Sequence, residues 1–199
     1  MSGRPLLLVN AAAPAAGRNG AIHAAFVADT LETLIGFTYC ADIEIHTDRD
    51  TGAWDWLDIP RRTGGPLIPE NRDHVVIFGT NTPSLPRAHV AVLLESDAGV
   101  TFGPTEQGGF YAVALCGAGT SPGAGSQPAW PPLPNCCPLE DALSAARRRG
   151  LQPALGSPWF AVQTPADFKR LDSYLPPRRT LRVLERLSLI PRRKRSSIR

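Results

Sequence analysis

The sequence has no long hydrophobic run, few cysteines and none of the common catalytic motifs. No stretch of its 199 residues approaches the roughly 20 apolar residues of a membrane-spanning helix, so we expect no membrane span. The four cysteines lack Cys-x-x-Cys spacing, which favours reduced thiols in a cytoplasmic protein. The four histidines lack the spacing of metal ligands. The sequence also lacks four common motifs: a Gly-x-Ser-x-Gly elbow, a Gly-Lys-Ser/Thr phosphate loop, His-Glu-x-x-His, and a Gly-x-Gly-x-x-Gly after the first expected strand. No motif therefore supports a serine hydrolase, a P-loop enzyme, a zinc protease or a dinucleotide-binding enzyme.

Charge is divided unevenly along the chain. Residues 178–199 hold nine of the 21 Lys and Arg but only one of the 18 acidic residues, so this segment carries a net charge of +8 and the rest of the chain −5. With 43% hydrophobic residues the rest suits one core, and we predict a single domain over 1–177 and a basic helix or tail over 178–199. The run Arg192–Arg195 could contact an anionic partner such as nucleic acid or a membrane surface. A solvated, frayed terminus is the alternative, favoured by the absence of aromatic residues in this segment.

Strand and helix signals alternate along the body and predict an α/β fold with a mostly parallel sheet. The continuous apolar run over 74–78 suits the centre of such a sheet. Residues 48–72 are expected to form a long loop, residues 117–134 a flexible excursion, and Gly36 a left-handed helix cap. We expect strands at 5–9, 43–47, 74–78, 99–102, 110–115 and 152–155, and helices at 22–35, 86–94, 139–149 and from 164 onward.

Two polar segments follow expected strands and are the main candidates for a binding site. Residues 79–86 are Gly-Thr-Asn-Thr-Pro-Ser-Leu-Pro, and residues 103–111 are Gly-Pro-Thr-Glu-Gln-Gly-Gly-Phe-Tyr. Ligands of open α/β sheets bind beyond the carboxyl ends of strands, so we expect both segments to lie at one cleft. The Gly108-Gly109 pair either lets a ligand approach the backbone closely or only permits a β-bulge.

Three segments resemble a bacterial glycosyltransferase-like family, rSAM/selenodomain-associated transferase 1, which has the GT-A fold of nucleotidyltransferases. Residues 79–85 match its Gly-Ser/Thr-Asp-x-Pro-x-Leu segment, and residues 103–111 match Gly-Pro-x-x-Asp-Gly-Gly-Tyr-Tyr. Residues 159–168 resemble Trp-x-Asp-Val-Asp-Thr-x-x-Asp-Leu. The resemblance implies a three-layer α/β/α GT-A domain that transfers a sugar or nucleotidyl group from a nucleotide-activated donor to a small acceptor.

The chain departs from this family at the acidic positions. Asn81, Gln107, Ala161 and Gln163 stand where the family has aspartate, and Arg18 is the single cation left in the loop after the first expected strand. Hard divalent cations prefer charged oxygen ligands. We therefore assign no metal ligand, and we expect no cofactor and weak or absent Mg²⁺ or Mn²⁺ binding.

The resemblance implies a nucleotide or nucleotide-sugar ligand, with Arg18 contacting its phosphates. Glu106, the one acid left in the two polar segments, is the candidate catalytic base, and an exposed loop glutamate without a role is the alternative. The ligand-binding candidates are Thr80, Asn81, Thr82, Gln107, Gly108, Gly109 and Gln163.

Some of these residues also have a purely structural interpretation. Asn81 could close an Asx-type turn ahead of Pro83. His23 is interpreted as a surface or boundary residue of its helix, and Trp159 as a core anchor.

Three functions of different classes stay open. The protein could be a metal-independent transferase, a degenerate relative that binds a nucleotide or sugar without turnover, or an interaction scaffold. The first requires cations such as Arg18, Arg61 or Arg62 to stabilise the departing diphosphate.

Overall fold

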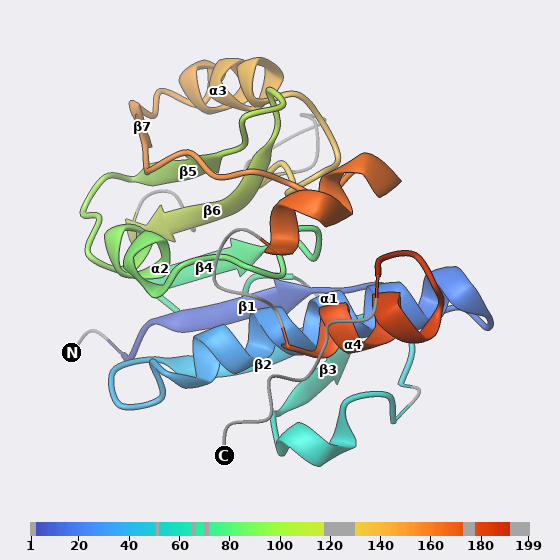
Figure 1. Cartoon of the computed structure of the whole chain (residues 1–199). Helices are drawn as coiled ribbons and strands as arrows, with labels where there is room; N and C mark the ends of the chain where they lie inside the picture. The colour runs from blue at the N-terminus through green and yellow to red at the C-terminus, as the bar shows by residue number, and fades with distance from the viewer. Residues whose placement is uncertain are drawn as a thin grey trace, which may run out of the picture.

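A seven-stranded sheet with the strand order β3-β2-β1-β4-β6-β5-β7 forms the centre of the molecule (Figure 1). The computed structural model describes residues 3–50, 52–64, 67–69, 72–117, 130–172 and 178–191. Its strands are β1 (Leu6–Asn10), β2 (Asp42–Thr47), β3 (Arg61–Thr63), β4 (His74–Phe78), β5 (Val100–Pro104), β6 (Phe110–Cys116) and β7 (Pro153–Leu155). Strand β6 is antiparallel to β4 and β5, and the other neighbouring pairs are parallel, which confirms the predicted mostly parallel sheet.

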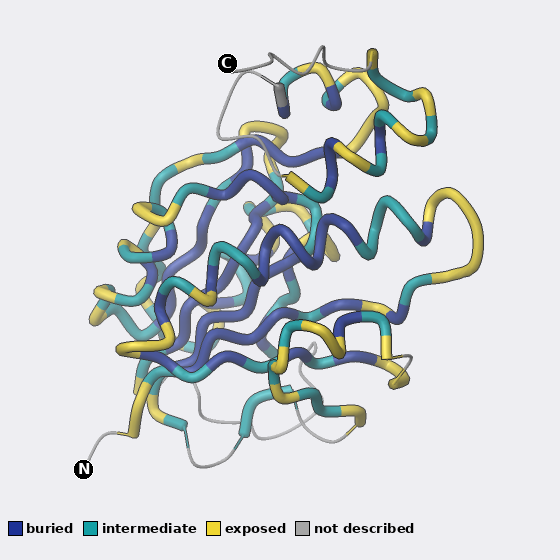
Figure 2. The backbone as a smooth tube through the Cα atoms, turned by 60° about the horizontal axis from the view of Figure 1, so that its bottom comes forward, coloured by how far each residue is buried: buried dark blue, intermediate teal, exposed yellow. Residues whose placement is uncertain are grey.

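The helices cover both faces of this sheet. Helices α1 (Arg18–Ile35) and α2 (Arg87–Leu94) pack on one face, and α3 (Leu139–Arg148) packs on the other. Figure 2 shows that buried residues follow the strands and the inner side of the helices. The three-layer α/β/α prediction is therefore confirmed. Among the described helices, none combines the length and apolar character that crossing a bilayer requires.

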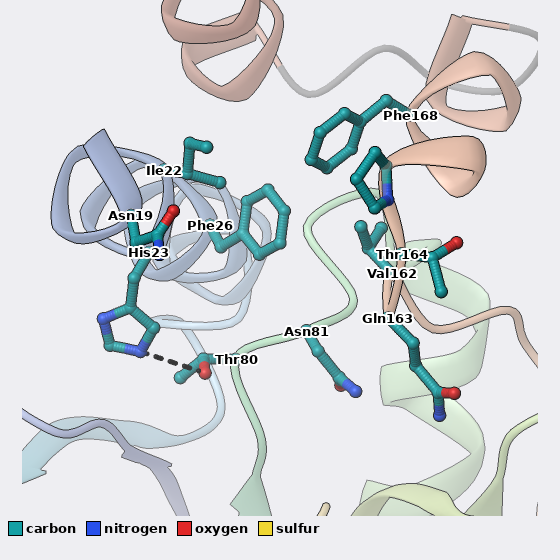
Figure 3. Close-up of a pocket in the computed structure, with 11 residues that line it drawn as sticks. Asn19, Ile22, His23, Phe26, Thr80, Asn81, Val162, Gln163, Thr164 and Phe168 are labelled. Atoms are coloured by element: carbon teal, nitrogen blue, oxygen red, sulfur yellow. Dashed lines mark hydrogen bonds between the residues drawn. The ribbon is translucent and has the colours of Figure 1, made fainter. Parts of the chain in front are cut away.

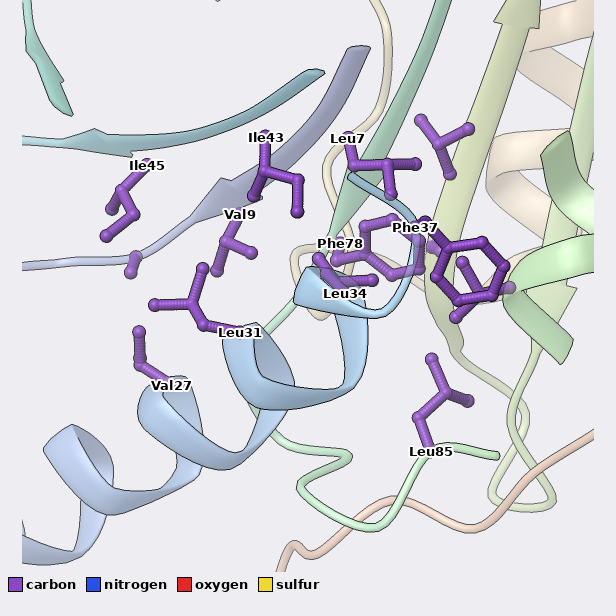
Figure 4. Packing of buried hydrophobic residues seen from close by; sticks show 14 of the residues in the cluster. Leu7, Val9, Val27, Leu31, Leu34, Phe37, Ile43, Ile45, Phe78 and Leu85 are labelled. Atoms are coloured by element: carbon purple, nitrogen blue, oxygen red, sulfur yellow. The ribbon is translucent and has the colours of Figure 1, made fainter. Parts of the chain in front are cut away.

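Successive apolar residues of the central strands point to opposite faces of the sheet and contribute to two hydrophobic cores, one on each face. In β1, Leu7 and Val9 face α1, whereas Leu6 and Leu8 belong to the cluster beneath α3. Figure 4 shows Leu31 of α1 against the first of these surfaces. Because successive strand residues point to opposite faces, an uninterrupted apolar run such as this one requires a sheet covered on both sides.

The beginning of the basic C-terminal segment is folded onto the domain. Helix α4 (Arg178–Arg186) lies along α1, and Leu181 and Leu184 share a buried cluster with Phe26 (Figure 1). This part of the segment is therefore packed, not frayed. The run Arg192–Arg195 lies outside the described residues, as do residues 118–129 of the expected excursion.

Two local predictions are wrong. The expected loop over residues 48–72 contains a short 3-10 helix, η1 (Asp55–Leu57), and the edge strand β3 (Arg61–Thr63). Gly36 has a right-handed conformation, with φ of −61°. A side chain there would press on the guanidinium of Arg87, because a Cβ would lie 2.6 Å from its Cζ. The Arg87 side chain is long and flexible and can move aside, so the described structure does not require glycine at this position.

Candidate functional site

A cleft lies at the edge of the sheet where β4 and β5 end. It consists of two adjoining pockets of about 370 Å³ and about 530 Å³ that share Asn81, Val162 and Gln163. The first pocket is lined by Asn19, Ile22, His23, Phe26, Thr80, Asn81, Val162, Gln163, Thr164, Pro165 and Phe168 (Figure 3). The second is lined by Asn81, Thr105, Gln107, Gly108, Gly109, Asn135, Cys137, Pro138, Val162 and Gln163. The expectation that the two polar segments meet at one cleft is thus met by this geometry.

The segment after β7 joins the two polar loops. The Val162 N–H donates to the Asn81 carbonyl at 2.8 Å, and the Glu106 N–H donates to the Trp159 carbonyl at 2.9 Å. The segment then enters η3 (Pro165–Asp172), a 3-10 helix whose start is capped by the Asp167 carboxylate. These bonds fix Gln163 at the boundary between the pockets.

Gln107 completes this connection with its side chain. Its Nε2 donates to the Ala161 carbonyl at 3.0 Å, and its Oε1 accepts the Ala161 N–H at 3.1 Å. The amide thus pairs with Ala161 as a neighbouring strand would. A carboxylate cannot do this, because it accepts hydrogen bonds but does not donate them. Gln107 lines the second pocket, but its polar atoms are engaged by the backbone.

Replacing Gln107 with Glu is expected to lower the free energy of unfolding by about 1–2 kcal/mol at neutral pH. The variant would lose one hydrogen bond and set a carboxylate oxygen against the Ala161 carbonyl. Stability should return as the pH falls toward about 4, where a protonated Glu can donate again. Chemical denaturation at both pH values tests this. Gln163→Glu, at an exposed position, is the matched control and should change stability little.

The glycines of the loops build the walls of the cleft. Gly108 has a left-handed φ of 82°, and its carbonyl accepts the N–H of Leu139 at the start of α3. The Gly109 N–H donates to the Thr105 hydroxyl at 3.0 Å. At Gly79 a Cβ would collide with the Asn135 side chain. The glycines therefore permit a tight turn and a close contact between segments, and Gly108 and Gly109 also line the second pocket.

Helix α1 contributes a wall that the sequence motifs do not indicate. Asn19, Ile22, His23 and Phe26 follow an i, i+3, i+4, i+7 spacing and share one face of the helix. The Thr80 hydroxyl lies 3.2 Å from His23 Nε2 (Figure 3). Burial lowers the pKa of His23 below its ordinary value, so the imidazole is uncharged at neutral pH. His23 is thus a site residue that was interpreted from the sequence as a boundary residue.

Thr80, Asn81, Gln107, Gly108, Gly109 and Gln163 all line the cleft. The structure leaves three other candidates outside its lining. Glu106 is half-exposed and pairs with Arg170, with 2.8 Å between Oε2 and Nη1. Thr82 is buried beneath the loop, and Arg18 is exposed at the start of α1.

The remaining cations proposed for a leaving group lie on the edge strand β3. Arg61 forms ion pairs with Asp50 and Asp55, and Arg62 lies 3.5 Å from Glu44. Neither lines the two pockets. Their charges are thus matched by acids of their own neighbourhood.

The donor groups of the cleft do not fit a carboxylate-held Mg²⁺ or Mn²⁺. Ala161 is fully buried and offers no side-chain donor, and the amide of Gln107 is engaged by the backbone. Asn81 and Gln163 supply neutral oxygens, which hold hard cations more weakly than carboxylates do. Across the described ranges no cluster of three or more His, Cys, Asp or Glu could hold a metal ion. We therefore derive no chemical step through a metal, and weak or absent metal binding stays a prediction.

Comparison with known proteins identifies the fold. No protein-family model and no curated protein matches the chain. A crystal structure of a putative nucleotide-diphospho-sugar transferase from Desulfovibrio desulfuricans G20 is similar, with a TM-score of 0.62, 17% identity, and coverage of 94% of this chain and 97% of that one. A 4-diphosphocytidyl-2C-methyl-D-erythritol synthase from Anaerococcus prevotii DSM 20548 has a TM-score of 0.53 and 10% identity, over 86% of this chain and 98% of that one.

These similarities confirm the predicted fold, that of nucleotide-diphospho-sugar transferases. At such low identity they establish the architecture alone, because one fold supports many chemistries. Membership of the rSAM/selenodomain-associated transferase 1 family stays a prediction that rests on the three sequence segments.

Proposed function

We propose that the protein binds a nucleotide or nucleotide sugar in the cleft and holds it without rapid turnover. The observation that carries the proposal is that no Asp, Glu, Lys or Arg is among the described residues lining the two pockets. Transfer from a nucleotide-activated donor builds negative charge on the leaving group, which transferases offset with cations or a metal. Amides, hydroxyls and apolar side chains can bind the rings of such a donor but do little to promote its departure.

A thermal-shift and calorimetry panel of nucleotides and nucleotide sugars tests this function. We expect at least one member to raise the melting temperature equally in Mn²⁺ and in chelator, because the cleft offers no carboxylate to a metal. Chromatography after long incubation should recover the donor intact. A rise that requires Mn²⁺ would contradict the proposal, and no binding by any member would favour the interaction scaffold.

Variants of residues that line the cleft test whether the ligand binds there. Thr80→Val and Asn81→Leu should each weaken binding by about 5- to 30-fold, the equivalent of one or two hydrogen bonds. Thr38→Val, at an exposed position after α1, is the matched control and should leave affinity unchanged. Equal affinities in all three variants would place the ligand elsewhere.

The pair of His23 and Thr80 favours a second candidate, a metal-independent transferase. The uncharged imidazole could accept the proton of an acceptor hydroxyl, whose oxygen would bond to the anomeric carbon or the phosphorus. Attack at the anomeric carbon would break its bond to oxygen and release the nucleoside diphosphate, whereas attack at the α-phosphorus would break a P–O bond and release pyrophosphate. In both cases solvent would have to stabilise the charge of the leaving group. Donor consumption that His23→Gln abolishes would support this candidate over binding without turnover.

A further inference from the structure

The two pockets adjoin each other, and the described residues that line them carry no charged side chain. The polar side chains among the lining residues are amides, hydroxyls, the His23 imidazole, whose pKa burial lowers, and the Cys137 thiol, whose pKa burial raises. A charged ligand group would therefore meet no opposite charge among the described residues that line the cleft.

Two cations next to the cleft segments, Arg170 and Arg18, do not belong to either lining. The Arg170 guanidinium pairs with Glu106 and lies 4.6 Å from the centre of the Phe160 ring. Arg18 starts α1 on the exposed side and is not part of either lining. Moving a diphosphate out of water without a counter-charge or hydrogen-bonded partner costs several kcal/mol or more. Binding through phosphates would thus be opposed by the lining.

The two halves of the cleft differ in chemistry. The first pocket has apolar walls from Ile22, Phe26 and Phe168, with Thr80 and His23 at one side (Figure 3). Such a mixture, in a volume of about 370 Å³, suits a ring with an apolar face and a polar edge.

The second pocket is more polar than the first. Its walls present the Thr105 and Asn135 side chains and the backbone of the Gly108-Gly109 turn. Asn81, at the boundary, has a side-chain oxygen that is buried and has no hydrogen-bond partner among the described residues. Hydroxyl groups of a sugar ring would supply donors to such acceptors.

We infer that the ligand binds through an uncharged, two-ring glycoside portion, with its less polar ring in the first pocket and its hydroxylated ring in the second. This inference rests on the proposed function and specifies which part of a nucleotide-type ligand carries the affinity. Nucleosides and aryl glycosides share this chemistry. Their phosphates, where present, extend from the cleft into solvent and add no affinity.

Calorimetry with matched pairs tests the inference on the full chain. We would compare each nucleoside with its 5′-monophosphate and 5′-diphosphate, and add aryl glycosides to separate a nucleobase from another ring. The uncharged member should bind as tightly as its diphosphate, within about threefold, and its affinity should not change between about 0.05 and 0.5 M salt. A diphosphate that binds about tenfold more tightly and loses this advantage in salt would overturn the inference while leaving the proposed function intact. No binding by either member would instead refute the proposed function.

A cation placed at the cleft provides a second test. Gln163 is exposed and borders both pockets, so Gln163→Lys should fold and should raise the ratio of diphosphate to nucleoside affinity several-fold. Gln152→Lys, an exposed position at the other end of the β7 segment, is the matched control for net charge. If the wild type already prefers diphosphates and Gln163→Lys adds nothing, the phosphates have a cationic site of their own and the inference fails.

Discussion

Replacing Asp29 with Ala is expected to lower the free energy of unfolding by about 2–3 kcal/mol and the melting temperature by roughly 5–10 °C. The Asp29 carboxylate accepts the backbone N–H of Arg179 at 3.1 Å and that of Thr180 at 2.7 Å. Asp29 is 4% exposed and Thr180 is fully buried, so alanine would leave these donors without a partner or water. A negative charge at the N-terminus of α4 also interacts favourably with the helix dipole. Denaturant unfolding and thermal scans measure the loss.

A neighbouring ion pair serves as the control for this prediction. Glu32 lies one turn from Asp29 on α1 and accepts a bond from Arg179 Nε at 2.6 Å, but both side chains are 39% exposed. Exposed pairs contribute well under about 1 kcal/mol, so Glu32→Gln should change stability little. Equal losses in the two variants would mean that general surface charge, and not the cap on α4, is responsible.

The pH dependence of the free energy of unfolding tests the contribution of the buried Asp29 carboxyl group. Burial raises the pKa of Asp29 above its ordinary value, although hydrogen bonds from Thr180 and Arg179 act in the opposite direction. The folded state therefore binds this proton more tightly than the unfolded chain does. The contribution of Asp29 is then complete below about pH 4 and decreases as the pH rises through the folded-state pKa. Compared with Asp29→Asn, which cannot titrate, the wild type should lose stability over that range.

The apolar strands could be predicted from the sequence because burial on both faces leaves a strong signal. The run over 74–78 became the central strand β4, and its neighbour β1 has the same character. Strand β3 could not be found this way. It lies at the edge of the sheet, and Arg61 and Arg62 are held by ion pairs that carry no hydrophobic pattern.

The cleft was only partly predictable for a related reason. Loop motifs locate residues that follow strands, and they brought Asn81 and Gln163 to the correct edge of the sheet. They cannot show whether a polar side chain faces a ligand or the backbone, and this is why Gln107 needed the structure. His23 was missed because its partner, Thr80, is far away in sequence and meets it only after folding. A helical spacing with Phe26 was the one available signal.

Glu106 illustrates a limit of reasoning from residue type. It is the one acid in the two polar segments, yet it points to Arg170 and does not line the described pockets. Its role as a catalytic base stays a prediction without support from the geometry.

Introducing carboxylates at Asn81 and Gln163 together is expected to convert the cleft into a divalent-ion site. Both residues border both pockets, and Figure 3 shows their side chains beside each other. Two adjacent carboxylates repel each other in the absence of a cation, so the Asn81→Asp/Gln163→Asp variant should melt below the wild type in chelator. Mn²⁺ would offset that repulsion and supply binding energy to the folded state alone. We therefore expect Mn²⁺ to raise the melting temperature of the double variant by several degrees, or roughly 1–3 kcal/mol.

The single variants determine whether this gain depends on paired carboxylates. Asn81→Asp or Gln163→Asp alone provides one charged ligand and should show little Mn²⁺ response, because hard cations need several oxygen ligands of which some are charged. The wild type should show none. A clear Mn²⁺-dependent rise in the wild type would mean that amide oxygens suffice at this cleft, and the interpretation of its uncharged lining would then be wrong. A response confined to the double variant would mean that the amides at these two positions limit metal binding in the wild type, in an architecture that places both side chains at one cleft.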